Sequence, residues 1–179
     1  SWDGWISANE TWTFATASTI TVRTGAASKY QIGDYIKWTQ TTVKYGIIAA
    51  VADTLLTIMV NDDYVVTNAA ISANFYSHSA NPIGFPTWFN YTPTITGFST
   101  LPTGANRVRK YMSVGRMMTL IYSDRQITAG VSNATSYNIT TPVIPIGYYR
   151  QAGVGTSMDN GGFSSAPGKF TTQDGTALL

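Results

Sequence analysis

Polar and apolar residues alternate in short segments through the first part of the chain. Residues 19–22 alternate with a period of two, which places Ile20 and Val22 on one face of an extended strand. Residues 35–40, 43–51 and 55–60 form further strand-like segments, with Gly, Asp and Asn at the turns. This pattern predicts a compact antiparallel β meander with Trp38 in its core.

A change in composition follows this meander. A last strand ends near Tyr76, so we expect the first domain to end near Ser79. Four of the seven prolines lie in residues 80–105, and proline has no amide hydrogen to give to a central strand. Because this stretch is also rich in aromatic residues, we predict a connector that is packed rather than solvated.

The second half opens with a predicted β-hairpin. Residues 107–114 and 116–124 are strand-like and meet at Gly115. In the second strand Met118, Leu120 and Tyr122 share one face, and Met117, Thr119 and Ile121 share the other. Both faces are rather apolar, which is typical of an inner strand of a β-sandwich.

The last part of the chain shows weaker periodicity. Residues 136–143 predict one more strand, and the chain from Gly147 onward is rich in glycine. We therefore predict an all-β protein: a small N-terminal β-barrel (residues 1–79), a connector (80–105) and a jelly-roll-like β-sandwich (106–179). The sandwich is expected to need further strands, either from residues that this sequence lacks or from neighbouring subunits.

Low charge supports the β prediction. Charged residues are 11% of the chain, against about 25% in an ordinary soluble domain. Basic residues cluster only at Arg107, Arg109 and Lys110, too few for the basic stripe of a nucleic-acid binder. We expect no nucleic-acid partner. The chain has no long apolar run and no leader-like start, so we expect neither membrane insertion nor an export signal.

The sequence offers little for catalysis. There is no Cys, and the one histidine, His78, has no second His or Cys with which to share a metal. A pair of carboxylates can hydrolyse a glycan, and the candidates are Asp62, Asp63, Asp159 and Glu10. The adjacent Asp62 and Asp63 are more typical of a turn. We predict no enzyme activity, no cofactor and no metal site, and a structural or exposed role for His78.

Aromatic residues in predicted loops are the candidate ligand-binding or interface residues. They are Trp88, Phe89, Tyr91, Tyr148 and Tyr149. Sugar rings stack on exposed aromatic faces, but aromatic residues also dominate cores and subunit interfaces. The interpretation as core or interface is favoured, and a carbohydrate-binding module that uses these rings is the alternative.

Several phrases of the sequence together resemble a family of virion proteins of tailed bacteriophages and prophages, described as tail-fibre, receptor-binding or minor structural proteins. The likeness covers roughly residues 2–91 and continues more loosely through residues 114–116 and 130–137. The phrases are Asp3-Gly4-Trp5-Ile6 with Glu10-Thr11-Trp12-Thr13, residues 29–37 (Lys-Tyr-Gln-Ile-Gly-Asp-Tyr-Ile-Lys), residues 39–45 (Thr-Gln-Thr-Thr-Val-Lys-Tyr) and residues 76–86 (Tyr-Ser-His-Ser-Ala-Asn-Pro-Ile-Gly-Phe-Pro).

This resemblance implies a β-barrel followed by a β-sandwich, displayed as a homotrimer on the surface of a phage particle. The expected partners are other virion proteins, of the capsid or the tail, and the hypothesis is compatible with a host surface glycan as a receptor. Relatives in this family carry further strands after the Asn-Gly turn region, where this chain ends at Leu179. The hypothesis is therefore a virion protein that acts by assembly and adhesion, either as a tail-fibre or receptor-binding protein or as a capsid-decoration protein.

Overall fold

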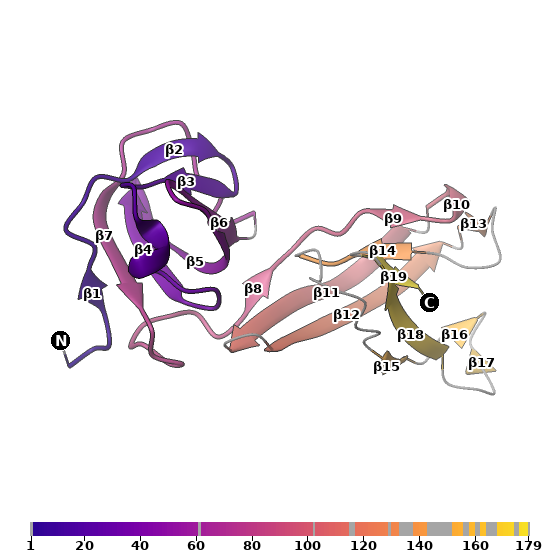
Figure 1. Ribbon diagram of the computed structural model, residues 1–179. Coiled ribbons are helices and arrows are strands. Elements are labelled where there is room, and N and C mark those ends of the chain that lie inside the picture. Colours follow the sequence, from indigo (N-terminus) through magenta and orange to yellow (C-terminus); the bar gives the residue numbers. More distant parts are fainter. Residues whose placement is uncertain are drawn as a thin grey trace. The chain divides into compact units, whose positions relative to one another are not determined.

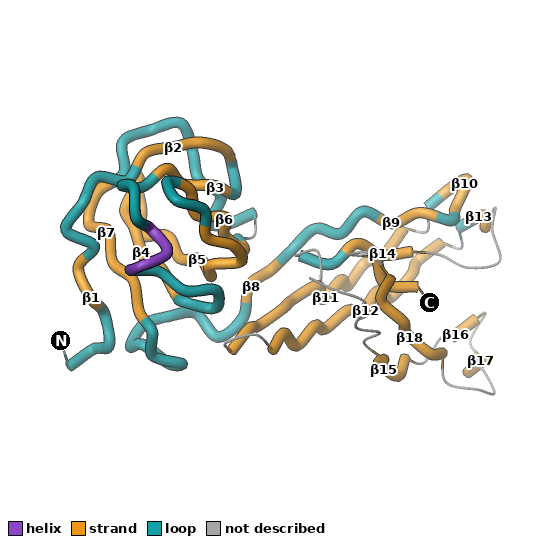
Figure 2. Tube along the Cα trace, viewed as in Figure 1, coloured by secondary structure: helices purple, strands orange, loops and turns teal. Residues whose placement is uncertain are grey.

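The computed structural model describes residues 2–60, 62–101, 103–114, 117–128, 130–132 and 138–142, together with five strands between residues 152 and 178. For residues 105, 106, 124–128 and 132, and for the strands after residue 151, the backbone alone is described. Within this part of the chain the structure is all-β, and its one helical turn is η1 (Ala26–Ser28), which Figure 2 shows among the strands. The all-β prediction is confirmed.

The chain divides into two compact units. The first contains Ser1–Thr92 and Arg109–Tyr122, and the second contains Pro93–Val108 and Ser123–Leu179. Residues 80–92, predicted as the start of a connector, thus belong to the first unit together with part of the predicted hairpin.

A seven-stranded antiparallel sheet forms most of the first unit (Figure 1). Its order is β1-β7-β4-β5-β6-β3-β2. The strands are β1 (Ile6–Ser7), β2 (Thr13–Thr16), β3 (Thr19–Thr21), β4 (Tyr35–Gln40), β5 (Thr42–Val51), β6 (Leu55–Met59) and β7 (Ser72–Ser77). The predicted meander is confirmed in β4, β5 and β6, which pair in sequence order.

The connection between β1 and β2 forces this sheet to curl. The two strands lie at opposite edges of the sheet, yet only residues 8–12 separate them in the chain. Six strand spacings in a flat sheet span about 29 Å, whereas the chain from Ser7 to Thr13 reaches at most about 22 Å. The sheet must therefore bend until its edges approach each other.

Hydrogen bonds hold this crossing segment against β7. The amide of Ala8 donates to the carbonyl of Asn74 at 2.9 Å, and the side-chain amide of Asn74 donates to the carbonyl of Glu10 at 2.9 Å. These bonds continue the β1–β7 pairing into the crossing segment, and none of the described sheets closes into a barrel. The prediction of a barrel followed by a sandwich is therefore not confirmed.

The concave side of the curled sheet holds the hydrophobic core. Ile20 and Val22 both lie in it, as their alternation predicts, and Trp38 is fully buried. In β4 the core residues Ile36 and Trp38 alternate with Tyr35, Lys37 and Thr39, whose side chains belong to the opposite face. The core residues are Ala8, Trp12, Ile20, Val22, Ala26, Tyr30, Ile36, Trp38, Ile48, Leu56, Ile58 and Val66.

A three-stranded sheet, ordered β12-β11-β8, contributes to both units. Its strands are β8 (Phe89–Asn90), β11 (Thr103–Val114) and β12 (Met117–Thr128). The predicted hairpin is confirmed in β11 and β12, which are neighbours in the sheet.

The second unit holds antiparallel strand pairs from segments that are far apart in the chain. A five-stranded sheet has the order β15-β18-β19-β14-β9, and β10 pairs with β13 and β16 with β17. The strands are β9 (Ile95–Thr96), β10 (Phe98–Thr100), β13 (Val131–Ser132), β14 (Asn138–Thr140), β15 (Ala152–Gly155), β16 (Met158–Asp159), β17 (Gly162–Phe163), β18 (Gly168–Gln173) and β19 (Thr176–Leu178).

Replacing the central core residue tests this packing. Trp38→Ala is expected to lower the free energy of unfolding by about 3–5 kcal/mol, because a large buried ring is lost and a cavity is left. Val43→Ala, at a position 46% exposed, is the control and should change stability little. Urea unfolding of both variants measures the difference, and a loss below about 1 kcal/mol for Trp38→Ala would contradict this core assignment.

Candidate interaction surface

A second layer of aromatic rings covers the sheet face opposite the core. We call Trp5, Tyr35, Tyr45, Tyr64, Phe85, Phe89, Tyr91 and Tyr111 the aromatic layer; each ring contacts at least one other. Phe85 lies near its middle, with ring-centroid distances of 4.2 Å to Tyr35, 5.5 Å to Phe89 and 5.7 Å to Tyr45. Residues from the predicted connector therefore pack on the outer face of β4 and β5.

The same layer attaches the end of the β11–β12 hairpin to the seven-stranded sheet. The ring of Tyr111 lies 5.4 Å from that of Phe89 and is fully buried. The buried hydroxyl of Tyr35 donates a hydrogen bond to the carbonyl of Ser113 at 2.6 Å, and burial raises the pKa of Tyr35. These contacts lie within the first unit and fix residues 111–113 relative to β4.

The candidate aromatic residues have different environments. Phe89 is 2% and Tyr91 7% exposed, so both rings face other side chains and are not free to stack on a ligand. Trp88 is half-buried. Tyr148 and Tyr149 lie outside the described residues.

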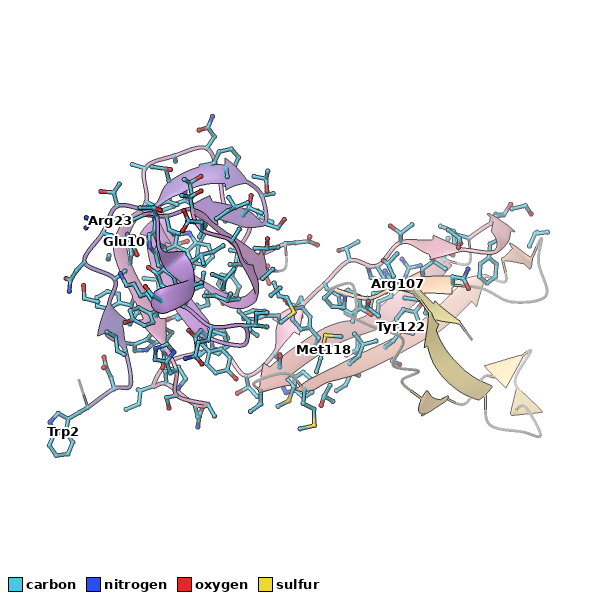
Figure 3. The ribbon with its side chains drawn as sticks, viewed as in Figure 1. Trp2, Glu10, Arg23, Arg107, Met118 and Tyr122 are labelled. Atoms are coloured by element: carbon cyan, nitrogen blue, oxygen red, sulfur yellow. The ribbon has the colours of Figure 1, made fainter. Side chains whose placement is uncertain are left out.

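One exposed aromatic residue was not singled out from the sequence. Trp2 is fully exposed, and Figure 3 shows its ring projecting away from the rest of the first unit. Sequence offers no signal for this exposure, because Trp5 and Trp12, close by in the chain, are both buried.

The hairpin presents two different faces. In β12 Met118, Leu120 and Tyr122 are half-buried, whereas Met117, Thr119 and Ile121 are exposed, which confirms the alternation expected from the sequence. Figure 3 labels Met118 and Tyr122 on the first of these faces, where the guanidinium of Arg109 lies 5.4 Å from the centre of the Tyr122 ring.

We call the side of the hairpin opposite Tyr111 and Ser113 the hairpin face; it consists of the half-buried Met112 and the exposed Lys110, Val114, Met117, Thr119 and Ile121. Met117 is 70% exposed, Ile121 40% and Val114 39%. Exposed apolar side chains that are contiguous on a surface mark sites of interaction, unlike single scattered ones. This face is therefore the candidate interaction surface of the first unit.

The only glutamate, Glu10, has a structural environment. Its Oε1 accepts hydrogen bonds from the Lys29 ammonium, at 2.8 Å, and from the Tyr30 hydroxyl, and its Oε2 accepts one from the Arg23 amide at 2.9 Å. Figure 3 shows Glu10 and Arg23 close together. Burial raises the pKa of Glu10, but these hydrogen bonds outweigh it and hold the pKa below its ordinary value.

The other candidate carboxylates are also engaged within the fold. Asp62 accepts a hydrogen bond from the Thr92 hydroxyl, and Asp63 accepts one from the Asn90 side chain at 3.2 Å. The side chain of Asp159 lies outside the described residues. Among the residues described, no group of three His, Cys, Asp or Glu side chains is placed to hold a metal ion.

His78 has a partner that its sequence neighbours do not reveal. Its Nδ1 lies 2.8 Å from Oδ1 of Asp34, a buried carboxylate whose Oδ2 accepts a hydrogen bond from the Gln31 amide at 2.8 Å. The pair joins the residue that follows β7 to the residue that precedes β4. This contact gives His78 a structural role in the first unit.

Lys44 is a buried ammonium that sequence reasoning missed. It donates to the carbonyl of Val65 at 2.6 Å and lies 3.4 Å from Oε1 of Gln40, and burial lowers its pKa. Gln40 also donates to the carbonyls of Thr67 and Ala69. The signal was present in β5, because Lys44 shares its face with Gly46 and Ile48.

Comparisons with known proteins found no matching protein family, no matching curated protein and no matching solved structure. In the described part of the chain, none of the helical structure is long or apolar enough to cross a membrane.

The Glu10 hydrogen bonds predict a pH-dependent contribution to stability. Because the folded state lowers the pKa of Glu10, its contribution is fully present above the unfolded value, about 4.3, and is lost as the pH falls through the folded-state pKa. At pH 7 Glu10→Gln should lower the free energy of unfolding by about 1–3 kcal/mol. In urea unfolding from pH 7 to pH 3, the difference between wild type and variant should shrink; a constant difference would contradict this role.

Two tyrosines in the aromatic layer provide a matched pair of variants. Tyr35→Phe removes the donor to the buried Ser113 carbonyl and should lower the free energy of unfolding by about 1–3 kcal/mol. The buried hydroxyl of Tyr111 has no hydrogen-bond partner among the described residues, so Tyr111→Phe should be neutral or stabilising. Equal effects in thermal unfolding would show that the Tyr35–Ser113 bond does not hold the hairpin.

Proposed function

We propose that this chain is a structural component of a bacteriophage virion, a homotrimeric tail-fibre, receptor-binding or capsid-decoration protein that acts by assembly and surface adhesion and has no catalytic activity. The observation that carries the assembly part of the proposal is the hairpin face. It exposes Val114, Met117 and Ile121 on a strand pair whose other side is anchored by Tyr111 and Ser113. A rigid surface with exposed apolar side chains is suited to a permanent partner.

The resemblance to phage virion proteins supplies the biological setting. Many of its residues have structural environments in the first unit: Glu10, Trp12, Lys29 and Tyr30 form one hydrogen-bonded cluster. Trp5, Tyr35, Tyr45 and Phe85 belong to the aromatic layer. The residues that carry the resemblance therefore have roles in the folding of the first unit. The proposed virion setting rests on all of the quoted sequence segments taken together.

The finer architecture belongs to the same proposal. In the assembled particle the first unit acts as a small barrel-like module, and the second unit becomes a jelly-roll-like sandwich with strands from neighbouring subunits. Its five-stranded sheet ends in β9, a strand of two residues, and in β15, a strand of four. Edges of this kind are protected from aggregation when a neighbour covers them.

A carbohydrate-binding module is the second candidate function. The fully exposed ring of Trp2 favours it, since sugar rings stack on exposed aromatic faces. Phe89 and Tyr91, two of the aromatic residues suggested by the sequence, are buried, which argues against sugar binding by their rings. Trp88, from the same group, is partly exposed. Adhesion to a host glycan is compatible with the virion proposal.

Immunogold electron microscopy tests the proposed location. An antibody raised against the purified chain should label particles produced by the bacterium or phage that encodes it, on the head for a decoration protein and on the tail for a fibre protein. Particles without label, from a stock in which the chain is expressed, would contradict the proposal. A glycan array probed with wild type, Trp2→Ala and Trp88→Ala tests the second candidate, which predicts binding that either substitution weakens.

A further inference from the structure

Residues 62–69 lie between β6 and β7 and belong to no described strand. This segment is anchored in both layers of the first unit: the ring of Tyr64 lies 5.4 Å from that of Phe89 in the aromatic layer, and Val66 is buried in the core. The amide of Val66 also donates to the carbonyl of Ala17 at 2.9 Å. We call residues 62–69 the strap, because they join the two layers.

Buried polar side chains of β4 and β5 hold the C-terminal end of the strap. Gln40 is 3% and Lys44 8% exposed. The side-chain amide of Gln40 donates to the carbonyls of Thr67 and Ala69, at 2.8 and 3.0 Å, and its Oε1 accepts a hydrogen bond from the Thr67 amide at 3.1 Å. Lys44 donates to the carbonyl of Val65 at 2.6 Å. The strap carbonyls thus supply acceptors for buried donors, which nearly always need them.

The N-terminal end of the strap is attached to β8 and to the residues that follow it. Asp62 accepts a hydrogen bond from the Thr92 hydroxyl, and Asp63 accepts one from the side chain of Asn90 at 3.2 Å. Asn90 lies in β8, and β8 pairs with β11 of the hairpin. The strap therefore links the buried polar residues of β4 and β5 to the strand that carries one side of the hairpin.

The buried ammonium of Lys44 adds a cost to the closed strap. The acceptors that it contacts, the Val65 carbonyl and Oε1 of Gln40, are both neutral. Neither ion pair found among the described residues includes Lys44. A buried ammonium loses most of its hydration, and neutral oxygens replace that hydration incompletely. Opening of the strap would return Lys44 to water without breaking any strand pairing of the seven-stranded sheet.

We propose that the strap opens as one unit while the seven-stranded sheet stays folded, and that this opening loosens the attachment of β8. Local opening is typical of segments that lie outside the strand ladders and have few buried apolar contacts. When the strap opens, Asn90 and Thr92 lose their bonds to its carboxylates, and Phe89 loses its contact with Tyr64. This inference follows from contacts within the first unit and does not depend on a virion setting.

Native-state hydrogen exchange in urea tests the local opening. Relative to its intrinsic rate, the wild-type Val66 amide should exchange at least ~10-fold faster than the hydrogen-bonded core amides of Ile48 and Ile58. Low urea should accelerate Val66 little, because opening the strap exposes little surface, and should accelerate the core amides steeply. The same rate and the same urea dependence at all of these amides would mean that the strap opens only when the sheet unfolds, which would overturn the inference.

Removing the hydrogen bonds at one end of the strap should make its opening more frequent. Gln40→Leu deletes the groups that bond to Thr67 and Ala69, and it should speed exchange of the Val66 amide at least ~10-fold. Gln31→Leu is the matched control: it makes the same substitution at an exposed position and should leave the Val66 rate unchanged. Circular dichroism checks that both variants keep the wild-type fold. A wild-type Val66 rate in folded Gln40→Leu would contradict the role given to the strap.

A variant at the opposite end tests whether the strap opens as one unit, and it also serves if Gln40→Leu does not fold. Asn90→Ala combined with Thr92→Val deletes the donors to the strap carboxylates at exposed positions. If both ends open together, this double variant should also speed the Val66 amide, by at least ~3-fold. An unchanged rate would show that the two ends open separately and would sink the inference. Immunogold labelling of particles bears on the proposed function alone, so either proposal can fail without the other.

Discussion

The fold of the first unit depends on the short path that residues 8–12 take between opposite edges of the seven-stranded sheet. A flat sheet of this width cannot be spanned by so short a segment, so the sheet curls and its concave side becomes a closed core. Trp12 enters that core from the crossing segment itself, and Glu10, two residues earlier, fastens the segment to Lys29 and Tyr30. The same residues therefore set the curvature and seal the core.

The curl leaves the convex face of β4 and β5 to be covered by other residues. Phe85 and Phe89 cover it, and they come from a stretch whose prolines exclude it from the middle of a sheet. Rings that pack at 4 to 6 Å and exclude water hold the end of the hairpin in place through Tyr111 and the Tyr35–Ser113 bond. One side of the hairpin is buried in this way, and its other side is left with exposed Met and Ile side chains.

This division of faces is the basis of the functional proposals. Phe89 and Tyr91, which the sequence suggested as ligand contacts, instead pack against Tyr111 on the buried side of the hairpin, whereas Met117 and Ile121 of β12 lie on its exposed side. The proposed assembly role rests on this exposed side of the hairpin.

The sequence by itself determined the all-β class, the strands of the meander, the hairpin strands β11 and β12 and the two faces of β12, because a period of two is a local property of neighbouring residues. Tertiary structure alone decided that the sheet stays open, that His78 meets Asp34, that Tyr35 reaches Ser113 and that Lys44 is buried against Val65. Tyr35 and Ser113 are 78 positions apart in the chain. Alternation tells which face a residue takes, but contacts between distant segments depend on how the whole sheet bends, and that bend follows from the strand order.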